Sequence, residues 1–261
     1  MNASIQISQD PSVHYLLRIG DTCLILAQRL GEWCGHGPVL EEDIALTNMA
    51  LDLVGQARGV LTRAGELEAL AGGAHHDEDQ LAFLRDERDY RNLTLVELPR
   101  GDFAVTVTRN LMIATLLKHL WQRLQTSSDA ELAGVAGKAV KEASYHQQHA
   151  ADWVLRLGDG TEESRVRMEA ALNQLWPYVA EIFEPDAIDE HAARSGLGPR
   201  WAELRAGWLA EVGSVLDAAG LTAPAERAFR STGKQGRHSE HMGYILAEMQ
   251  YLQRSFPGGA W

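Results

Sequence analysis

The stretch from Ser128 to Leu157 most strongly constrains what this 261-residue chain can fold into. Ser128 followed by Glu131 is a capping-box pattern for a helix start, and Gly158 is typical of a helix end. Between them, small and apolar residues recur at alternating steps of four and three, which places them on one helix face. That face is formed by Leu132, Ala136, Ala139, Ala143, His146, Ala150, Trp153 and Leu157. A long face of small residues predicts a helix buried in a bundle.

His146 lies in the middle of this face, three residues after Ala143. In helical bundles that hold two iron ions, two helices each carry a Glu-x-x-His pair, so that a carboxylate and an imidazole project toward the metal. Alanine has no atom that binds a metal. The helix therefore has the position of a ligand-bearing helix without its carboxylate.

Three other long helices are predicted. The first begins at Asp10-Pro11, with aspartate as the cap and proline at the first helical position. The second begins in the acidic run 41–43, which suits the positive end of a helix, and Gly101-Asp102 begins the third. The second helix is expected to present one face through Ile44, Thr47, Leu51, Val54, Arg58 and Leu61.

These four helices form two hairpins, joined by a polar crossover at 75–99 with a short helix at 79–86 and a possible extended run at 92–96. Further helices are expected at 161–183, with a kink at Pro177, at 199–219 and at 238–254. We predict an all-α fold, a ferritin-like four-helix bundle with additional C-terminal helices. It would be a single domain over 1–261, with the core bundle at about 11–158 and peripheral helices at about 161–254.

A di-iron site in this chain is not expected, because its ligands are missing. A bundle of that kind needs about four carboxylates and two histidines. None of the ten histidines has an acidic residue three positions earlier, and 103–127 contains no aspartate or glutamate. On the second helix the corresponding pair is Leu53 and Gln56, and on the fourth it is Ala143 and His146. We therefore predict these four as degenerate metal-ligand positions, with no catalytic residue, no cofactor and no metal in this chain.

Two histidine pairs remain. His146 with His149, and His238 with His241, each place two imidazoles near one another, but further zinc ligands cannot be identified. We interpret His146 as a core histidine and the 238–241 pair as solvated or part of an interface. A nucleophile elbow, a phosphate-binding loop and a dinucleotide fingerprint are all missing from the sequence.

Composition narrows the possible partners. The formal net charge is −12, which disfavours nucleic acid and anionic membranes. Cys23 and Cys34 are too far apart along one helix for a disulfide, and are expected to be reduced core thiols. The N-terminal residues lack the pattern of a signal peptide, and no apolar run is long enough to cross a membrane. A cytoplasmic protein is expected.

Four longer strings carry a resemblance to a known family. They are LAQRLGEWCGH at 26–36, LDLVGQAR at 51–58, FLRDERDY at 83–90 and LAEMQYLQR at 246–254. With them, the chain from about Tyr15 to Trp261 resembles the C subunits of the bacterial ring-1,2-phenylacetyl-CoA epoxidase.

The resemblance implies a ferritin-like paralogue of the catalytic A subunit, which holds the di-iron centre and binds the CoA thioester. In that family the C subunit has lost the metal ligands and supports the A subunit structurally. A small B subunit and a reductase that passes electrons from NADPH are the indirect partners, and the pathway is aerobic phenylacetate breakdown.

Two hypotheses of different classes follow. The first is a non-catalytic structural subunit of this oxygenase. The second is a metal-independent enzyme or ligand-binding bundle that uses the vacated centre as an apolar pocket, with His146 and Gln56 as its polar groups. Nothing in the sequence pairs His146 with an activated nucleophile, so the first is favoured. Interface residues are expected in the C-terminal segment and among exposed tryptophans.

Overall fold

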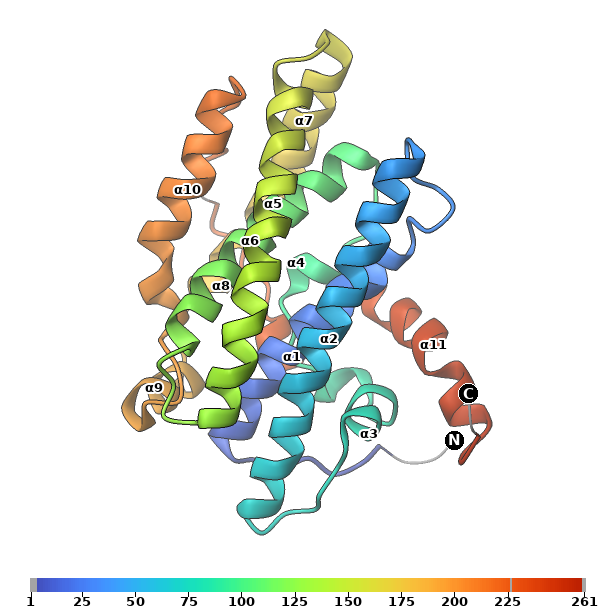
Figure 1. Ribbon diagram of the computed structural model, residues 1–261, viewed down its shortest axis with the longest axis vertical. Coiled ribbons are helices and arrows are strands. Elements are labelled where there is room, and N and C mark those ends of the chain that lie inside the picture. The colour runs from blue at the N-terminus through green and yellow to red at the C-terminus, as the bar shows by residue number, and fades with distance from the viewer. Residues whose placement is uncertain (1–3, 226, 260–261) are drawn as a thin grey trace. The chain divides into compact units, whose positions relative to one another are not determined.

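The computed structural model describes residues 4–225 and 227–259, and the regular structure there is helical apart from one isolated bridge between Thr232 and Arg237 (Figure 1). The all-α prediction is confirmed. The described chain divides into two compact units. One comprises the residues up to Pro99 and those from Ser231 onward, and the other comprises Arg100–Arg230. The prediction of a single domain stays a prediction.

The first unit is built on an antiparallel hairpin of α1 (Pro11–Gly31) and α2 (Leu40–Leu70). The predicted start of α1 is confirmed: the Asp10 carboxylate accepts the backbone N–H of Ser12, and Pro11 opens the helix. The two helices approach closely at Gly20, where a Cβ atom would lie 2.9 Å from a methyl carbon of Leu61. A larger residue at 20 would force the hairpin apart.

Short elements complete this unit. They are α3 (Glu78–Phe83), the 3-10 turn η1 (Glu87–Asp89), α4 (Thr94–Glu97), the 3-10 turn η4 (Gly233–Gln235) and α11 (Glu240–Ser255). α11 packs against α1, α3 and α4. The possible extended run at 92–96 is wrong. Its apolar residues sit in and before the single helical turn of α4 and are buried, so their β propensity is overridden by packing.

The second unit is built on the hairpin of α5 (Phe103–Leu124) and α6 (Ala130–Gly158). The predicted cap of α5 is confirmed, because Asp102 accepts the N–H of Val105. The predicted cap of α6 is displaced by one residue. Asp129 accepts the N–H of Leu132, while the Ser128 hydroxyl donates to the carbonyl of Ser195.

The later part of this unit runs through α7 (Glu162–Leu175), η2 (Trp176–Tyr178), α8 (Val179–Phe183), α9 (Ala187–Ser195), η3 (Trp201–Leu204) and α10 (Arg205–Ala218). The predicted kink at Pro177 appears as the 3-10 turn η2. The sequence pattern does not predict the helix α9. α10 packs on α5 through Trp208, whose indole N–H donates to the carbonyl of Met112 at 2.7 Å.

The series of residues expected along α2 does not form its buried face, and Leu61 alone among the six is buried. Ile44, Leu51 and Val54 are 53%, 64% and 40% exposed, and the Arg58 side chain is 74% exposed. The buried face is formed by a second apolar series of the same helix, which comprises Leu46, Met49, Leu53, Ala57, Val60 and Ala64. Both series have helical spacing, so periodicity alone could not choose between them.

Candidate functional site

Leu53 and Gln56 lie one turn apart on the buried face of α2, 1% and 3% exposed. Gln56 is oriented toward α1, where its Oε1 atom lies 3.8 Å from the thiol sulfur of Cys23, within range of a weak S–H hydrogen bond. That these two residues stand where a related bundle has a Glu-x-x-His pair stays a prediction. Cys23 is a buried thiol outside any disulfide, as predicted, but Cys34 is exposed rather than a core thiol.

Ala143 and His146 lie one turn apart on α6, and both are buried in the second unit. His146 is 4% exposed, which confirms its interpretation as a core histidine. The predicted buried face of α6 is confirmed from Leu132 to Ala150, and Val154 continues it where Trp153 is only half-buried.

The donor set at these four positions does not fit a di-iron centre. Hard iron ions bind carboxylate oxygen and imidazole nitrogen, whereas the pair in the first unit is a leucine with a neutral amide and the pair in the second unit is an alanine with one imidazole. Within the ranges 4–225 and 227–259, no cluster of three or more histidine, cysteine, aspartate or glutamate side chains is placed to hold a metal ion.

The first unit contains a buried ion pair that sequence reasoning missed. Asp21 of α1 and Arg85 are both fully buried, and Arg85 donates to both carboxylate oxygens, at 3.0 Å to Oδ2. The backbone N–H of Arg91 adds a bond of 2.8 Å to Asp21. Asp21 lies in the middle of α1 among buried residues. Only the position of Arg85, 64 residues later, explains why a carboxylate is tolerated inside.

A second buried carboxylate, Glu97, corrects the prediction for the 238–241 pair. The side chain of His238 is 1% exposed, and its Nδ1 atom lies 2.6 Å from Glu97 Oε1. The Nε2 atom faces the carbonyl of Tyr90 at 3.2 Å. His241 is partly exposed and is not part of this arrangement.

Glu97 organises the segment that leads into α11. Asn92 donates to Oε1, and the backbone and hydroxyl of Ser239 both donate to Oε2 at 2.8 Å. Burial lowers the pKa of His238, but the hydrogen bond and charge of Glu97 outweigh burial, so the net pKa is raised. Both ring nitrogens then donate, as an imidazolium does. The arrangement anchors α11; it holds no open position for a substrate.

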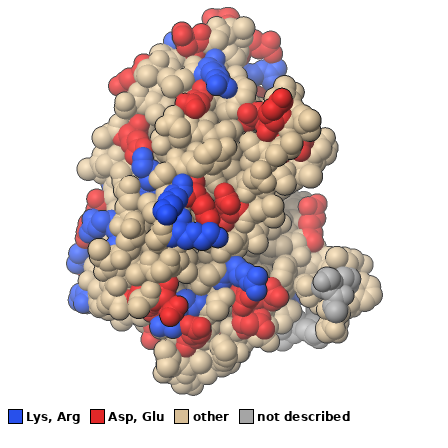
Figure 2. All heavy atoms as spheres, in the orientation of Figure 1, with Lys and Arg blue, Asp and Glu red and all other residues tan. Residues whose placement is uncertain are grey.

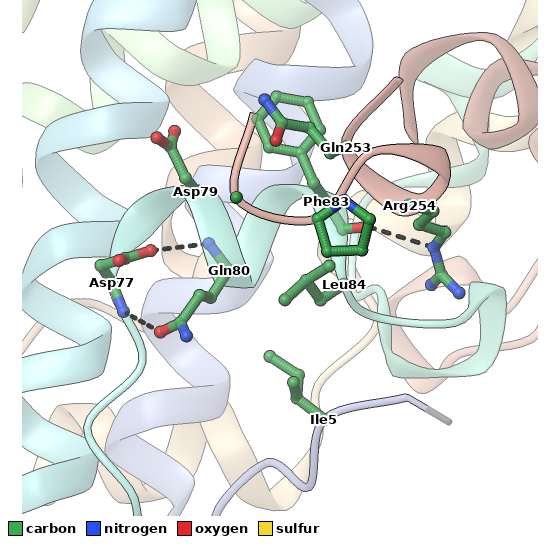
Figure 3. Close-up of a pocket in the computed structure, with 10 residues that line it drawn as sticks. Ile5, Asp77, Asp79, Gln80, Phe83, Leu84, Gln253 and Arg254 are labelled. Carbon is green, nitrogen blue, oxygen red and sulfur yellow. Dashed lines mark hydrogen bonds between the residues drawn. The ribbon is translucent and has the colours of Figure 1, made fainter. Parts of the chain in front are cut away.

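A surface cavity of about 350 Å³ lies in the first unit (Figure 3). Ile5, Phe83 and Leu84 give it apolar walls. Three of its polar residues are engaged within the chain: Asp77 and Gln80 bond each other's backbone as the cap of α3, and Arg254 donates to the carbonyl of Phe83 at 3.2 Å. Neither Gln56 nor His146 lines it, so this cavity gives no support to a ligand pocket built on those residues.

The two kinds of predicted interface candidate, exposed tryptophans and the C-terminal segment, differ in their exposure. All six tryptophans in the described ranges are buried or half-buried, so an exposed tryptophan is not available there. α11, by contrast, exposes Tyr244, Tyr251 and Leu252, and Phe256 directly after it is also exposed. No helix in the described part of the chain is long and apolar enough to cross a membrane.

Comparison with known proteins agrees with the resemblance. A family model described as phenylacetic acid catabolic protein matches residues 1–261. The chain is also similar to the C subunit of 1,2-phenylacetyl-CoA epoxidase from Escherichia coli (strain K12). The two are 49% identical over 247 residues, which cover 95% of this chain and 98% of that protein.

Proposed function

The chain belongs to the phenylacetic acid catabolic protein family, which has a ferritin-like helical fold, and we propose that it is the non-catalytic structural subunit of a phenylacetyl-CoA 1,2-epoxidase. Its role is to support the catalytic A subunit, which carries the iron. The small B subunit and the NADPH-dependent reductase are indirect partners. The observation that carries the proposal is the 49% identity to a C subunit, together with the lack, in the described ranges, of any cluster of three or more side chains placed to hold a metal ion.

A physical reason supports a subunit without metal beside a catalytic subunit that holds the iron. Carboxylates buried around a metal become costly when the metal is lost, because an unpaired buried charge is poorly solvated. Leucine at position 53 and alanine at 143 remove that cost and fill the space with apolar atoms. The fold then remains stable without iron and serves as a rigid surface for a partner.

The test compares three preparations: this chain alone, the catalytic A subunit alone, and the two co-expressed. We expect no stoichiometric iron or zinc in the lone chain, and about two irons per heterodimer in the complex. Phenylacetyl-CoA turnover, with reductase and NADPH supplied, is expected for the complex and not for this chain. About two irons per lone chain, or turnover by it, would contradict the proposal.

A further inference from the structure

The outer face of α2 carries exposed apolar residues along its N-terminal half. Leu40, Ile44, Leu51 and Val54 are 73%, 53%, 64% and 40% exposed and recur at helical spacing. We call these four residues, with Gly55, the α2 stripe. From Leu40 to Arg58 the helix extends about 27 Å at 1.5 Å per residue. Figure 2 shows acidic and basic side chains interspersed with uncharged surface on the face it draws. Single exposed apolar residues are ordinary on a protein surface, but several that recur along one helix face are typical of an interaction site.

α2 therefore carries apolar residues on two faces. Its inner face packs within the chain through Leu46, Met49, Leu53, Ala57 and Val60. A helix that is apolar on both sides is normally buried on both sides. The inner face is accounted for by the fold of this chain, and the α2 stripe is not.

Gly55 gives a second, independent indication. It lies four residues after Leu51 in the interior of α2 and is exposed, and a Cβ atom there would meet nothing within 4 Å. Glycine destabilises a helix interior relative to alanine. Gly20 on α1 is explained by the approach of Leu61, but nothing in the described chain approaches Gly55. A glycine here allows the backbone of another helix to come close.

Charge indicates what kind of partner fits. Acidic residues outnumber basic ones beside the stripe: Glu41, Glu42 and Asp43 lie at its N-terminal end and Asp52 lies further along. The cation near them is Arg58, which forms an ion pair of 3.0 Å with Glu78. A second copy of the chain would bring the same acidic surplus and another net charge of −12. Repulsion disfavours that pairing, and basic groups flanking an apolar helix complement it.

We propose that the α2 stripe is the surface on which this chain docks the catalytic subunit, through an apolar helix of that subunit flanked by basic residues. This rests on the proposed function and assigns the docking to one helix. The stripe alone is smaller than the roughly 800 Å² per partner of a standard interface, so it forms the central part of a wider contact.

The test substitutes Leu51→Glu and, as a matched control, Leu70→Glu. Both residues are exposed leucines of α2, 64% and 76% exposed, but Leu70 is the last residue of the helix and lies off the stripe. Binding of each variant to the catalytic subunit is measured by titration, with circular dichroism and the melting temperature of the lone chain as fold controls. We expect L51E to raise Kd at least about 30-fold and L70E to change it less than about twofold.

A second variant, Gly55→Leu, tests the close approach. It adds a side chain where this chain leaves open space, so the melting temperature of the lone chain should not fall, while Kd for the catalytic subunit rises at least about tenfold. L51E binding with unchanged Kd would overturn the docking surface and leave the proposed function standing. Failure of the unsubstituted chain to bind would overturn the proposed function itself. Loss of self-association by L51E in sedimentation of the lone chain would show that a second copy is the occupant, against our proposal.

Discussion

At the residue scale, the most informative side chains are buried charges whose partners are distant in sequence. Asp21 meets Arg85, and Glu97 meets His238, across separations of 64 and 141 residues. A helical pattern treats each of these residues as a polar position to be turned outward. The pairs are visible only when the fold brings the partner into place, which is why sequence reasoning assigned His238 to the surface.

The Asp21–Arg85 pair gives a stability prediction. Replacing Asp21 by Asn leaves the guanidinium of Arg85 fully buried without its counter-charge, which we expect to cost about 3–5 kcal/mol of unfolding free energy. Urea unfolding followed by circular dichroism measures the loss. The control is Glu203→Gln, which breaks surface ion pairs with Arg123 and Arg200. The three side chains are 37%, 53% and 38% exposed, so the change should cost less than about 1 kcal/mol. Equal losses of unfolding free energy in the two variants would contradict the assignment of Asp21 and Arg85 as a stabilising buried ion pair.

The raised pKa of His238 predicts a pH dependence with a defined sign. Because the folded-state pKa lies above the ordinary value of 6.5, the protonated form favours the folded state. Its contribution is fully present below the unfolded-state pKa and is lost as the pH rises through the folded-state pKa. The destabilisation by His238→Gln should therefore be larger near pH 6 than near pH 8.5.

Unfolding of the unsubstituted chain and the variant at both pH values checks this expectation. His241→Gln is the matched control, since it removes an imidazole three residues away that is partly exposed and outside the Glu97 cluster. If H238Q lost the same stability at both pH values, the ion pair with Glu97 would have no thermodynamic role.

At the element scale, the sequence was sufficient where a local signal determines the structure. The caps at Asp10 and Asp102, and the break at Pro177, need only neighbouring residues. The register of α2 was not predictable, because Leu46 and Leu51 belong to two apolar series of equal periodicity. Leu53 and Gln56 are buried, as ligand positions would be, but their interpretation as degenerate metal-ligand positions stays a prediction.

Replacing either of two glycines of α2 by alanine should change the stability of the chain, in opposite directions. A Cβ atom at Gly65 would lie 1.8 Å from the carbonyl oxygen of His76, whereas one at Gly55 would meet nothing within 4 Å. We expect Gly65→Ala to destabilise the chain by about 1–3 kcal/mol through this clash with backbone. Gly55→Ala should instead stabilise it by about 0.5–1 kcal/mol. Denaturant midpoints of both variants, measured side by side, test whether α2 is packed at residue 65 and open at residue 55.

At the scale of the whole molecule, the two faces of α2 lie in different environments. Leu53 faces inward and is 1% exposed. Leu51, two residues earlier on the same helix, faces outward and is 64% exposed. Under our proposal, one face of this helix serves the fold of the chain and the other serves assembly with the catalytic subunit. The acidic groups beside the stripe, in a chain of net charge −12, would then favour a partner surface that carries basic residues.

The charge argument gives the last prediction. The double variant Glu41→Lys/Glu42→Lys changes the net charge by +4, from −12 to −8, at the first turn of α2. Glu162→Lys/Glu163→Lys makes the same change at the first turn of α7 and serves as its control, because both lose the same favourable helix-end charges. If acidic residues beside the α2 stripe steer the catalytic subunit, the first variant should lower the association rate constant about tenfold at about 50 mM salt, and the second much less. The difference should disappear near 1 M salt, where charges are screened within about 3 Å. Equal slowing by both variants would mean that net charge alone sets the rate and that the end of α2 has no part in the encounter.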